Sequence, residues 1–311
     1  MLQRLFLLLT LVLPLSTAAA DLKVVATSPS LGALVREIAG PNVKLGVHQG
    51  VHQGVQLEVL AGPDRDLHAL QVKPSMMRAL RGADLVVAMG ADLEIGWLPA
   101  VIANAANPKV LPGASGYFEA TAQVPLLDAG GTADRALGDV HPIGNPHINM
   151  DPVRMAQVGR ELAERLALLD PEGASQYRAA AAAFALKVEG RLPAWRSRAA
   201  KAPGVVLYHR DAIYLLDRLG IPLLGTLEPI PGVPMTGRQL TELTAALTGR
   251  SGVILYAPYH SPQAPAALAD RLGWQALQLG MEPPADADGD AYLRHIDRWV
   301  DALAAPRGPG Q

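Results

Sequence analysis

The segment ASQYRAAAAAFALKVEGRLPAWRSR, residues 174–198, lies in the middle of a chain of 311 residues. Its alanine run, Ala179–Ala183, and the helix formers on either side predict one helix of about 25 residues. A second helical pattern, 151–169, comes directly before it, and Asp170-Pro171-Glu172-Gly173 divides the two. A long helix at this place is suited to act as a rigid spacer between two halves of the chain.

Before this pair of helices, short β-like runs alternate with helix-length amphipathic stretches, the pattern of parallel sheets with crossover helices. In chain order, the predicted elements are a strand at 22–26, a helix at 30–38, a strand at 55–60, a short helix after Pro74 and a strand at 85–88. The stretch from there to Pro142 is less regular, and no element is predicted in it.

The same alternation resumes after the long helix. Predicted strands at 205–208, 222–227, 253–256 and 275–279 alternate with predicted helices at 212–219, 236–247, 264–272 and 291–303. The predicted fold class is therefore α/β, with two similar lobes, each with a parallel sheet, joined by one long helix. We place the N-terminal lobe at 21–170, the linking long helix at 171–200 and the C-terminal lobe at 201–306.

Residues 1–20 have the features of a secretory signal peptide. Met1–Arg4 is a short positive start, Leu5–Leu15 is apolar except for one Thr and one Pro, and Ser16–Ala20 supplies a small-residue cleavage site. A helix needs about 20 apolar residues to cross a bilayer, and this run is shorter. We therefore expect a periplasmic protein that is soluble after cleavage; a retained N-terminal membrane anchor is the alternative.

The composition excludes several classes of function. With 27 Lys and Arg against 29 Asp and Glu, the chain has no basic field for nucleic acid and no acidic tail. It contains no Cys, which excludes thiolate metal sites, thiol catalysis and a lipid-attachment cysteine. It also has no H-E-x-x-H motif, no G-x-G-x-x-G after a strand and no Walker loop.

Three of the eight histidines lie on loops at related places. His209 follows a predicted strand directly, and His68 lies in a loop after a predicted strand. His147 comes just before a helix start, where Asp151 is the predicted N-cap and Pro152 the first helical residue. Because ligands of open α/β sheets bind beyond the carboxyl ends of strands, we expect these side chains to meet in a cleft between the lobes.

A lone loop histidine is more often structural than functional, so the prediction rests on the set of three. Imidazole nitrogens suit tetrahedral zinc, and a carboxylate or water fills the fourth position. Glu228 and Glu282 each follow a predicted strand, and with water they are the candidates for that position. The predicted metal ligands are His68, His147, His209 and Glu282.

The remaining histidines are less informative. Gly46-Val47-His48-Gln49 recurs as Gly50-Val51-His52-Gln53. We favour an exposed duplication without function; an accessory pair of histidines that picks up metal is the alternative.

His141 precedes His147 in the same predicted loop. We favour a simple loop histidine at this position, and a flexible extra ligand is the alternative. His260 and His295 have polar or turn-forming neighbours and are predicted to lie at the surface.

Three ordered motifs carry a resemblance to a known family. They are Asp66-Leu67-His68 followed by Pro74-Ser75, then Pro146-His147-Ile148-Asn149-Met150-Asp151-Pro152, and then Leu207-Tyr208-His209 with Tyr214 and Leu219-Gly220-Ile221. Through these motifs, from about Leu22 to Leu303, the chain resembles the zinc/manganese substrate-binding proteins of ABC importers, the TroA-like periplasmic metal-binding family.

The resemblance implies two lobes on one linking helix and a metal ligand at each of His68, His147 and His209. It also implies delivery of the metal to a membrane permease and its ATPase. The family's fourth ligand, an Asp, falls near Gly280-Met281, where Glu282 is the nearest acid.

The chain departs from the family pattern in three places. Leu67 stands where Pro is usual, Ala257–His260 stands where an acidic residue is usual, and the long His- and acid-rich loop of many zinc-specific relatives is missing. These departures bear on the fourth ligand.

A histidine at position 209, where manganese-binding relatives usually have Glu, shifts the ligands towards nitrogen, which zinc prefers. We therefore predict a monomeric zinc-capturing protein without catalytic residues. The alternatives are a zinc hydrolase with a three-histidine site and an open fourth position, a manganese-binding homologue, and a metal chaperone or adhesin that never meets a permease.

Overall fold

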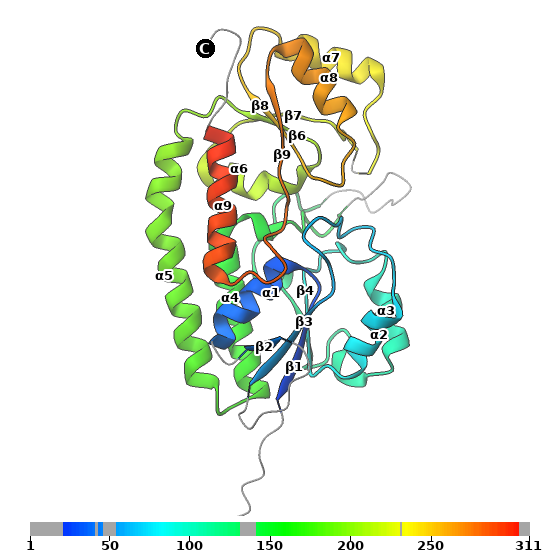
Figure 1. Cartoon of the computed structure of the whole chain (residues 1–311), viewed down its shortest axis with the longest axis vertical. Coiled ribbons are helices and arrows are strands. Elements are labelled where there is room, and N and C mark those ends of the chain that lie inside the picture. Colours follow the sequence, from blue (N-terminus) through cyan, green and yellow to red (C-terminus); the bar gives the residue numbers. More distant parts are fainter. Residues whose placement is uncertain (1–20, 41–42, 46–53, 131–140, 231, 305–311) are drawn as a thin grey trace, which may run out of the picture.

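The computed structural model of the chain describes residues 21–40, 43–45, 54–130, 141–230 and 232–304. Two α/β lobes lie one above the other, and helix α5 (Ala174–Ala199), in green, runs along one side from the lower lobe to the upper one (Figure 1). Within the described residues, no helix has both the length and the apolar character needed to cross a membrane. The predicted signal peptide, 1–20, lies outside them.

The first lobe contains a parallel sheet of five strands in the order β2-β3-β1-β4-β5. Its strands are β1 (Leu22–Ala26), β2 (Val43–Leu45), β3 (Val55–Val59), β4 (Leu85–Ala88) and β5 (Tyr117–Glu119). Along β1 the side chains alternate, so that Val24 and Ala26 pack in one core and Val25 in another. Parallel strands buried on both faces read as continuous apolar runs, which is why β1 and β4 could be predicted.

Helices cover both faces of this sheet (Figure 1). They are α1 (Pro29–Ala39), α4 (Pro152–Leu169) and α5 on one face, and α2 (Pro74–Arg81) and α3 (Leu98–Ala105) on the other. With both faces covered, the loops at the carboxyl ends of the strands are the part of the sheet that remains available for a site.

The second lobe repeats this plan with four parallel strands in the order β7-β6-β8-β9. Its elements are β6 (Val205–Leu207), α6 (Ile213–Leu219), β7 (Leu223–Thr226), α7 (Gly237–Leu247), β8 (Val253–Tyr256), α8 (Gln263–Leu272), β9 (Gln275–Gln278) and α9 (Gly289–Ala304). Val206 and Ile254 pack with Leu268 of α8, whereas Val205 and Leu207 belong to the core that also contains the first lobe.

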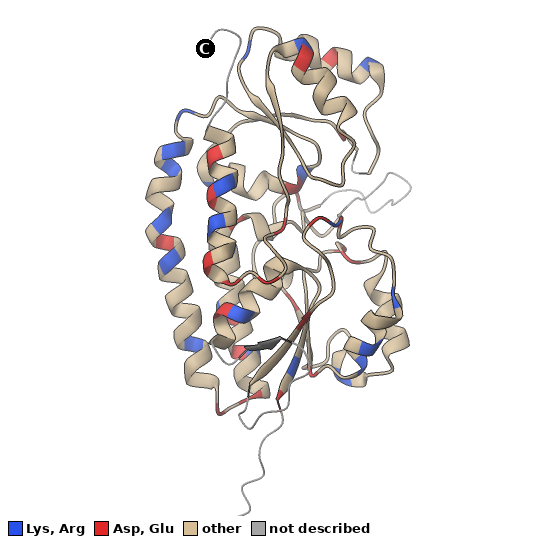
Figure 2. Cartoon of the chain, viewed as in Figure 1, with Lys and Arg blue, Asp and Glu red and all other residues tan. Residues whose placement is uncertain are grey.

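Helix α9 returns from the second lobe and packs against α1 and α5 (Figure 1). Both signs of charge occur along α5 and α9 (Figure 2). Asp297 of α9 accepts hydrogen bonds from Trp195 and Arg198 of α5, each at 2.7 Å. One hydrophobic core contains residues of both lobes. The long helix is therefore part of a packed interface rather than a bare spacer.

The predicted helices and strands are present, with ends that differ by about two residues at most. The structure adds elements where none was predicted, namely β2, α3 and β5. β2 and β5 have three residues each, too few to show an alternating pattern. Short 3-10 turns complete the list: η2 (Pro108–Val110), η3 (Thr121–Gln123), η5 (Ile148–Met150) and η6 (Arg210–Ala212).

Candidate metal centre

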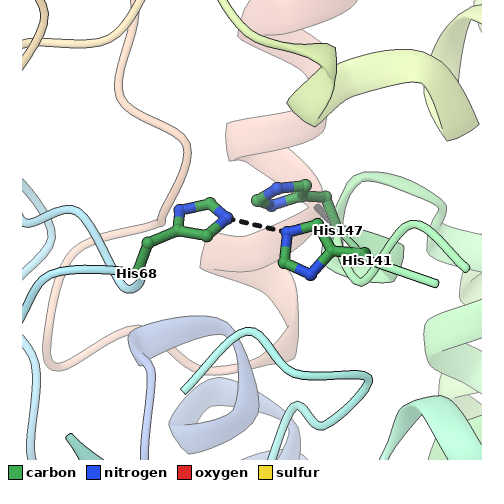
Figure 3. A group of neighbouring side chains, drawn as sticks. All are labelled: His68, His141 and His147. Carbon is green, nitrogen blue, oxygen red and sulfur yellow. Dashed lines mark hydrogen bonds between the residues drawn. The ribbon is translucent and has the colours of Figure 1, made fainter. Parts of the chain in front are cut away.

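Four histidine rings meet between the two lobes, on segments that follow strands. His68 follows β3, His141 and His147 lie on the long connection from β5 to α4, and His209 follows β6. Figure 3 shows His68 on one side, with its ring directed at those of His141 and His147. The three histidines predicted from the sequence are thus brought together, and a fourth joins them.

The four rings are neighbours, and the ligand atoms of three of them are close enough to share one ion. The centroid of the His68 ring lies 5.2 Å from those of His141 and His147 and 5.3 Å from that of His209. The centroids of His147 and His209 are also 5.3 Å apart. One ligand atom from each of His68, His141 and His147 lies within 4.8 Å of the other two. His209 lies outside this group of three, although its ring neighbours those of His68 and His147.

The Nε2 atoms of His68 and His141 lie 3.1 Å apart. Two nitrogens bound to one tetrahedral zinc at about 2.0–2.1 Å lie about 3.3 Å from each other. The spacing of this pair is therefore close to that of two ligands on one zinc ion.

Asp66 fixes the orientation of His68. The Nδ1 of His68 lies 2.8 Å from Oδ1 of Asp66, which also accepts the backbone N–H of His68 at 2.9 Å. Burial alone would raise the pKa of Asp66, but the hydrogen bonds and charge of His68 outweigh it, so this pKa lies below its ordinary value. An ionised Asp66 accepts the Nδ1 proton and leaves Nε2 of His68 available to a metal.

Glu228 does the same for His209. The Nδ1 of His209 lies 3.0 Å from Oε2 of Glu228, and the backbone N–H of Gly232 donates to the same oxygen at 3.2 Å. Burial lowers the pKa of His209, but its hydrogen bond to Glu228 and nearby carboxylate charges outweigh it, so this pKa lies above its ordinary value. Glu228 was a candidate fourth ligand in the sequence. In the structure it contacts Nδ1 of His209 instead.

His147 carries the clearest sign of a missing partner. Its side chain is buried, with 7% exposure, and its Nε2 has no hydrogen-bond partner among the described residues. Burial, together with the charges of the three other histidines, holds the pKa of His147 well below its ordinary value. A neutral, buried imidazole with an unpartnered nitrogen is costly unless a ligand engages that nitrogen, and a metal ion fits this requirement.

His141 is held by a turn of unusual backbone shape. Its Nδ1 lies 3.1 Å from the carbonyl oxygen of Ala91, so that Nε2 is directed at His68. Gly90, Ala91 and Asp92 all have positive φ, at 88°, 47° and 67°. Non-glycine residues in this region are strained and tend to occur at functional sites. Of the two interpretations of His141 that the sequence left open, its position among the rings favours the ligand.

Contacts across the lobes hold the segment that carries His147. Asn145 donates to the carbonyl oxygen of Arg210 at 2.8 Å, and its own carbonyl accepts from the hydroxyl of Tyr214 at 2.6 Å. Asp151 caps α4 as predicted, by accepting the backbone N–H of Val153, and Pro152 is the first helical residue.

Glu282, the predicted fourth ligand, is engaged elsewhere. Its Oε2 accepts the backbone N–H of Ser30 at 2.6 Å, and its Oε1 accepts from the side-chain amide of Asn149 at 3.1 Å. Burial raises the pKa of Glu282 to about 7. The carboxylate therefore joins the second lobe to the start of α1.

The prediction of a surface position is wrong for His295. His295 is buried, with 4% exposure, because it lies on the inward face of α9 with Ile296 and Trp299. His260 is half-buried and stacks on Tyr208, with ring centroids 4.0 Å apart. Burial lowers the pKa of each to about 4. His48 and His52 lie outside the described residues.

A cavity of about 300 Å³ lies against the ring cluster. Its lining includes His68 and His209 as well as both carboxylates that orient them, Asp66 and Glu228. The cavity gives solvent a path to one side of the histidines.

Solved structures share this fold. A zinc-bound deletion mutant of ZnuA superposes with a TM-score of 0.71 at 19% identity, over 92% of this chain and 97% of that one. The substrate-binding protein FpvC of Pseudomonas aeruginosa with Ni²⁺ gives 0.72 at 21%, over 92% and 96%. A laminin-binding protein of Streptococcus agalactiae, described as having adhesin and metal transporting activity, gives 0.66 at 19%, over 91% and 100%.

The family comparison covers nearly the whole described chain. Residues 24–305 match the family "Zinc-uptake complex component A periplasmic". The chain therefore belongs to the ZnuA family, the periplasmic metal-binding proteins that serve ABC importers.

Proposed function

We propose that this chain captures a divalent metal ion, zinc in preference to manganese, on His68, His141, His147 and His209 and delivers it to a membrane permease. The observation that carries the proposal is the buried Nε2 of His147, which has no hydrogen-bond partner in the described part of the chain and lies on a ring that neighbours three other imidazole rings.

The hydrogen bonds support four nitrogen ligands. In His68, His141 and His209 the Nδ1 atom is engaged by Asp66, Ala91 and Glu228 respectively, which leaves Nε2 for the metal. Glu282 is not in the proposed set, because Ser30 and Asn149 occupy its oxygens. His141 takes the fourth position instead.

The donor set favours zinc. Imidazole nitrogen suits zinc, whereas manganese prefers oxygen ligands. Four neutral imidazoles bring no charge of their own, and the carboxylates of Asp66 and Glu228 balance the two positive charges of the ion. Manganese remains the second choice of cargo.

The number of protein ligands also decides whether the metal could act as a catalyst. A hydrolytic zinc site keeps one coordination position open for water, whereas a four-histidine site would fill a tetrahedral ion. We therefore propose that the chain is not an enzyme.

The family works with an ABC permease and its ATPase. We propose that this chain acts as a monomer, exported through its first twenty residues and free in the periplasm, with lobes at 21–170 and 201–306 joined by 171–200. Nucleic acid has no place in this function.

The test combines metal analysis with substitution. Protein purified from the periplasm is expected to contain one zinc per chain, and His68→Ala, His147→Ala and His209→Ala should each weaken zinc binding. Thermal unfolding of the metal-free forms serves as the control for folding. If all three variants bind zinc like the parent, the proposed site is wrong.

A further inference from the structure

A second cavity, of about 370 Å³, opens on the first lobe beside the metal centre. We call it the apolar groove. Its larger side chains are Ile95, Leu98, Ile102, Leu111, Tyr117 and Ile143. Ile95, Leu111 and Ile143 are 45%, 46% and 58% exposed. Exposed aliphatic side chains gathered at one hollow are typical of a binding surface, whereas single ones are not.

The charge of the groove has one sign. Three carboxylates, Asp92, Glu94 and Glu119, are among the described residues that line it, and none of those residues is Lys or Arg. Glu94 is buried and its oxygens accept hydrogen bonds from neighbouring residues, so the half-buried Asp92 and Glu119 supply the charge that an occupant would meet. An occupant that complements this surface would carry a large apolar side chain beside a cationic one. Two copies of this chain joined through their grooves would bring like charges together, which disfavours a second copy as the occupant.

The groove is connected to a proposed metal ligand. Ala91 lines the groove, and its carbonyl oxygen holds the ring of His141 at 3.1 Å. Glu119, also in the lining, accepts the backbone N–H of Ala91 at 3.1 Å. Ile143 follows His141 by two residues. A side chain seated in the groove would therefore press on Ala91, which holds the ring of His141, and on Ile143, which lies two residues after it.

We propose that the apolar groove docks an apolar and basic segment of the membrane permease, and that docking loosens His141. This inference rests on the proposed function, because it requires a permease that receives the metal. It links recognition by the partner to release of the ion, since the metal would lose one of four ligands when the groove is filled.

The test separates docking from metal binding. Ile95→Asp and Leu111→Asp place a charge in the groove and leave the histidines untouched. Leu186→Asp is the matched control, since Leu186 is 68% exposed on α5, on a different part of the surface. Each variant replaces the parent in cells of the source organism for zinc-uptake measurements, and its zinc affinity is measured on purified protein.

Zinc uptake is expected to fall about tenfold or more in both groove variants, as for a lost interface anchor, while zinc affinity stays at the parental value. Leu186→Asp should match the parent in both measurements. A photo-crosslinking residue at position 111 should join the permease subunit, identified by mass spectrometry.

Parental uptake in both groove variants would overturn the docking proposal and leave the proposed function standing. So would a dimer of the parent that Ile95→Asp dissociates without loss of uptake, because the groove would then be a self-association surface. If the parent itself supports no zinc uptake, the proposed function fails, and the docking proposal fails with it.

Discussion

The Nδ1 atom of His209 lies 3.0 Å from Oε2 of Glu228. This contact places the proton on Nδ1 and leaves Nε2 of His209 as the nitrogen available to a metal. Asp66 makes the same contact with His68 at 2.8 Å. Two proposed ligands from different lobes are thus oriented in the same way, each by a carboxylate that contacts Nδ1 of its ring.

Glu228→Gln should weaken zinc binding about 10- to 100-fold, the usual effect of removing a carboxylate behind a ligating histidine. The amide keeps the size of the side chain and removes its charge. Competition titration with a chelating dye measures the change. Glu242→Gln, on the exposed face of α7, is the control. Equal affinities for Glu228→Gln and the parent would show that the contact has no role in binding.

A pair of variants distinguishes the two candidates for the fourth ligand. His141→Ala removes a proposed nitrogen ligand and should lower zinc affinity sharply. Glu282→Gln retains an oxygen that can accept the N–H of Ser30 and should leave zinc affinity near the parental value. Isothermal titration of both proteins checks this. The opposite ranking would restore Glu282 as the ligand.

Zinc affinity should fall as the pH drops from about 7.5 to about 5.5, because an imidazolium cannot bind metal. The pKa of His209 is raised, so its ring holds a proton at a higher pH than an ordinary histidine does, and zinc must displace that proton. The pKa of His147 is well below its ordinary value because of burial, so its ring stays neutral and does not compete. Affinities measured at three pH values test this. A constant affinity over the range would be incompatible with histidine ligands.

Zinc should stabilise the folded chain. At a free concentration of about a thousand times Kd, a ligand that binds only the folded state adds about 4 kcal/mol to the free energy of unfolding. Thermal unfolding with and without zinc measures the shift, and a chelator should reverse it. His147→Ala should lose most of the shift. A similar shift in that variant would mean that zinc binds elsewhere.

The sequence predicted the two-lobed fold well because its signals are local. The helical pattern around Ala179–Ala183 and the apolar runs at β1 and β4 can each be recognised from a few consecutive residues. The strands β2 and β5 are too short to do so. Three histidines could be chosen because each lies in a recognisable loop motif.

The fourth ligand could not be predicted from local sequence patterns. Glu282 was chosen as the nearest acid, but its contacts with Ser30 and Asn149 depend on how the lobes pack, which no local pattern reports. His141 owes its orientation to the carbonyl of Ala91, which is fifty positions away in a strained turn. His295 is buried because α9 folds back on the first lobe.

X-ray absorption at the zinc edge measures the ligands of the bound ion directly. The zinc-loaded parent should show four imidazole nitrogens at about 2.0–2.1 Å, and His141→Ala should show one fewer. A parent site with three nitrogens and a carboxylate oxygen would contradict the proposed four-histidine site.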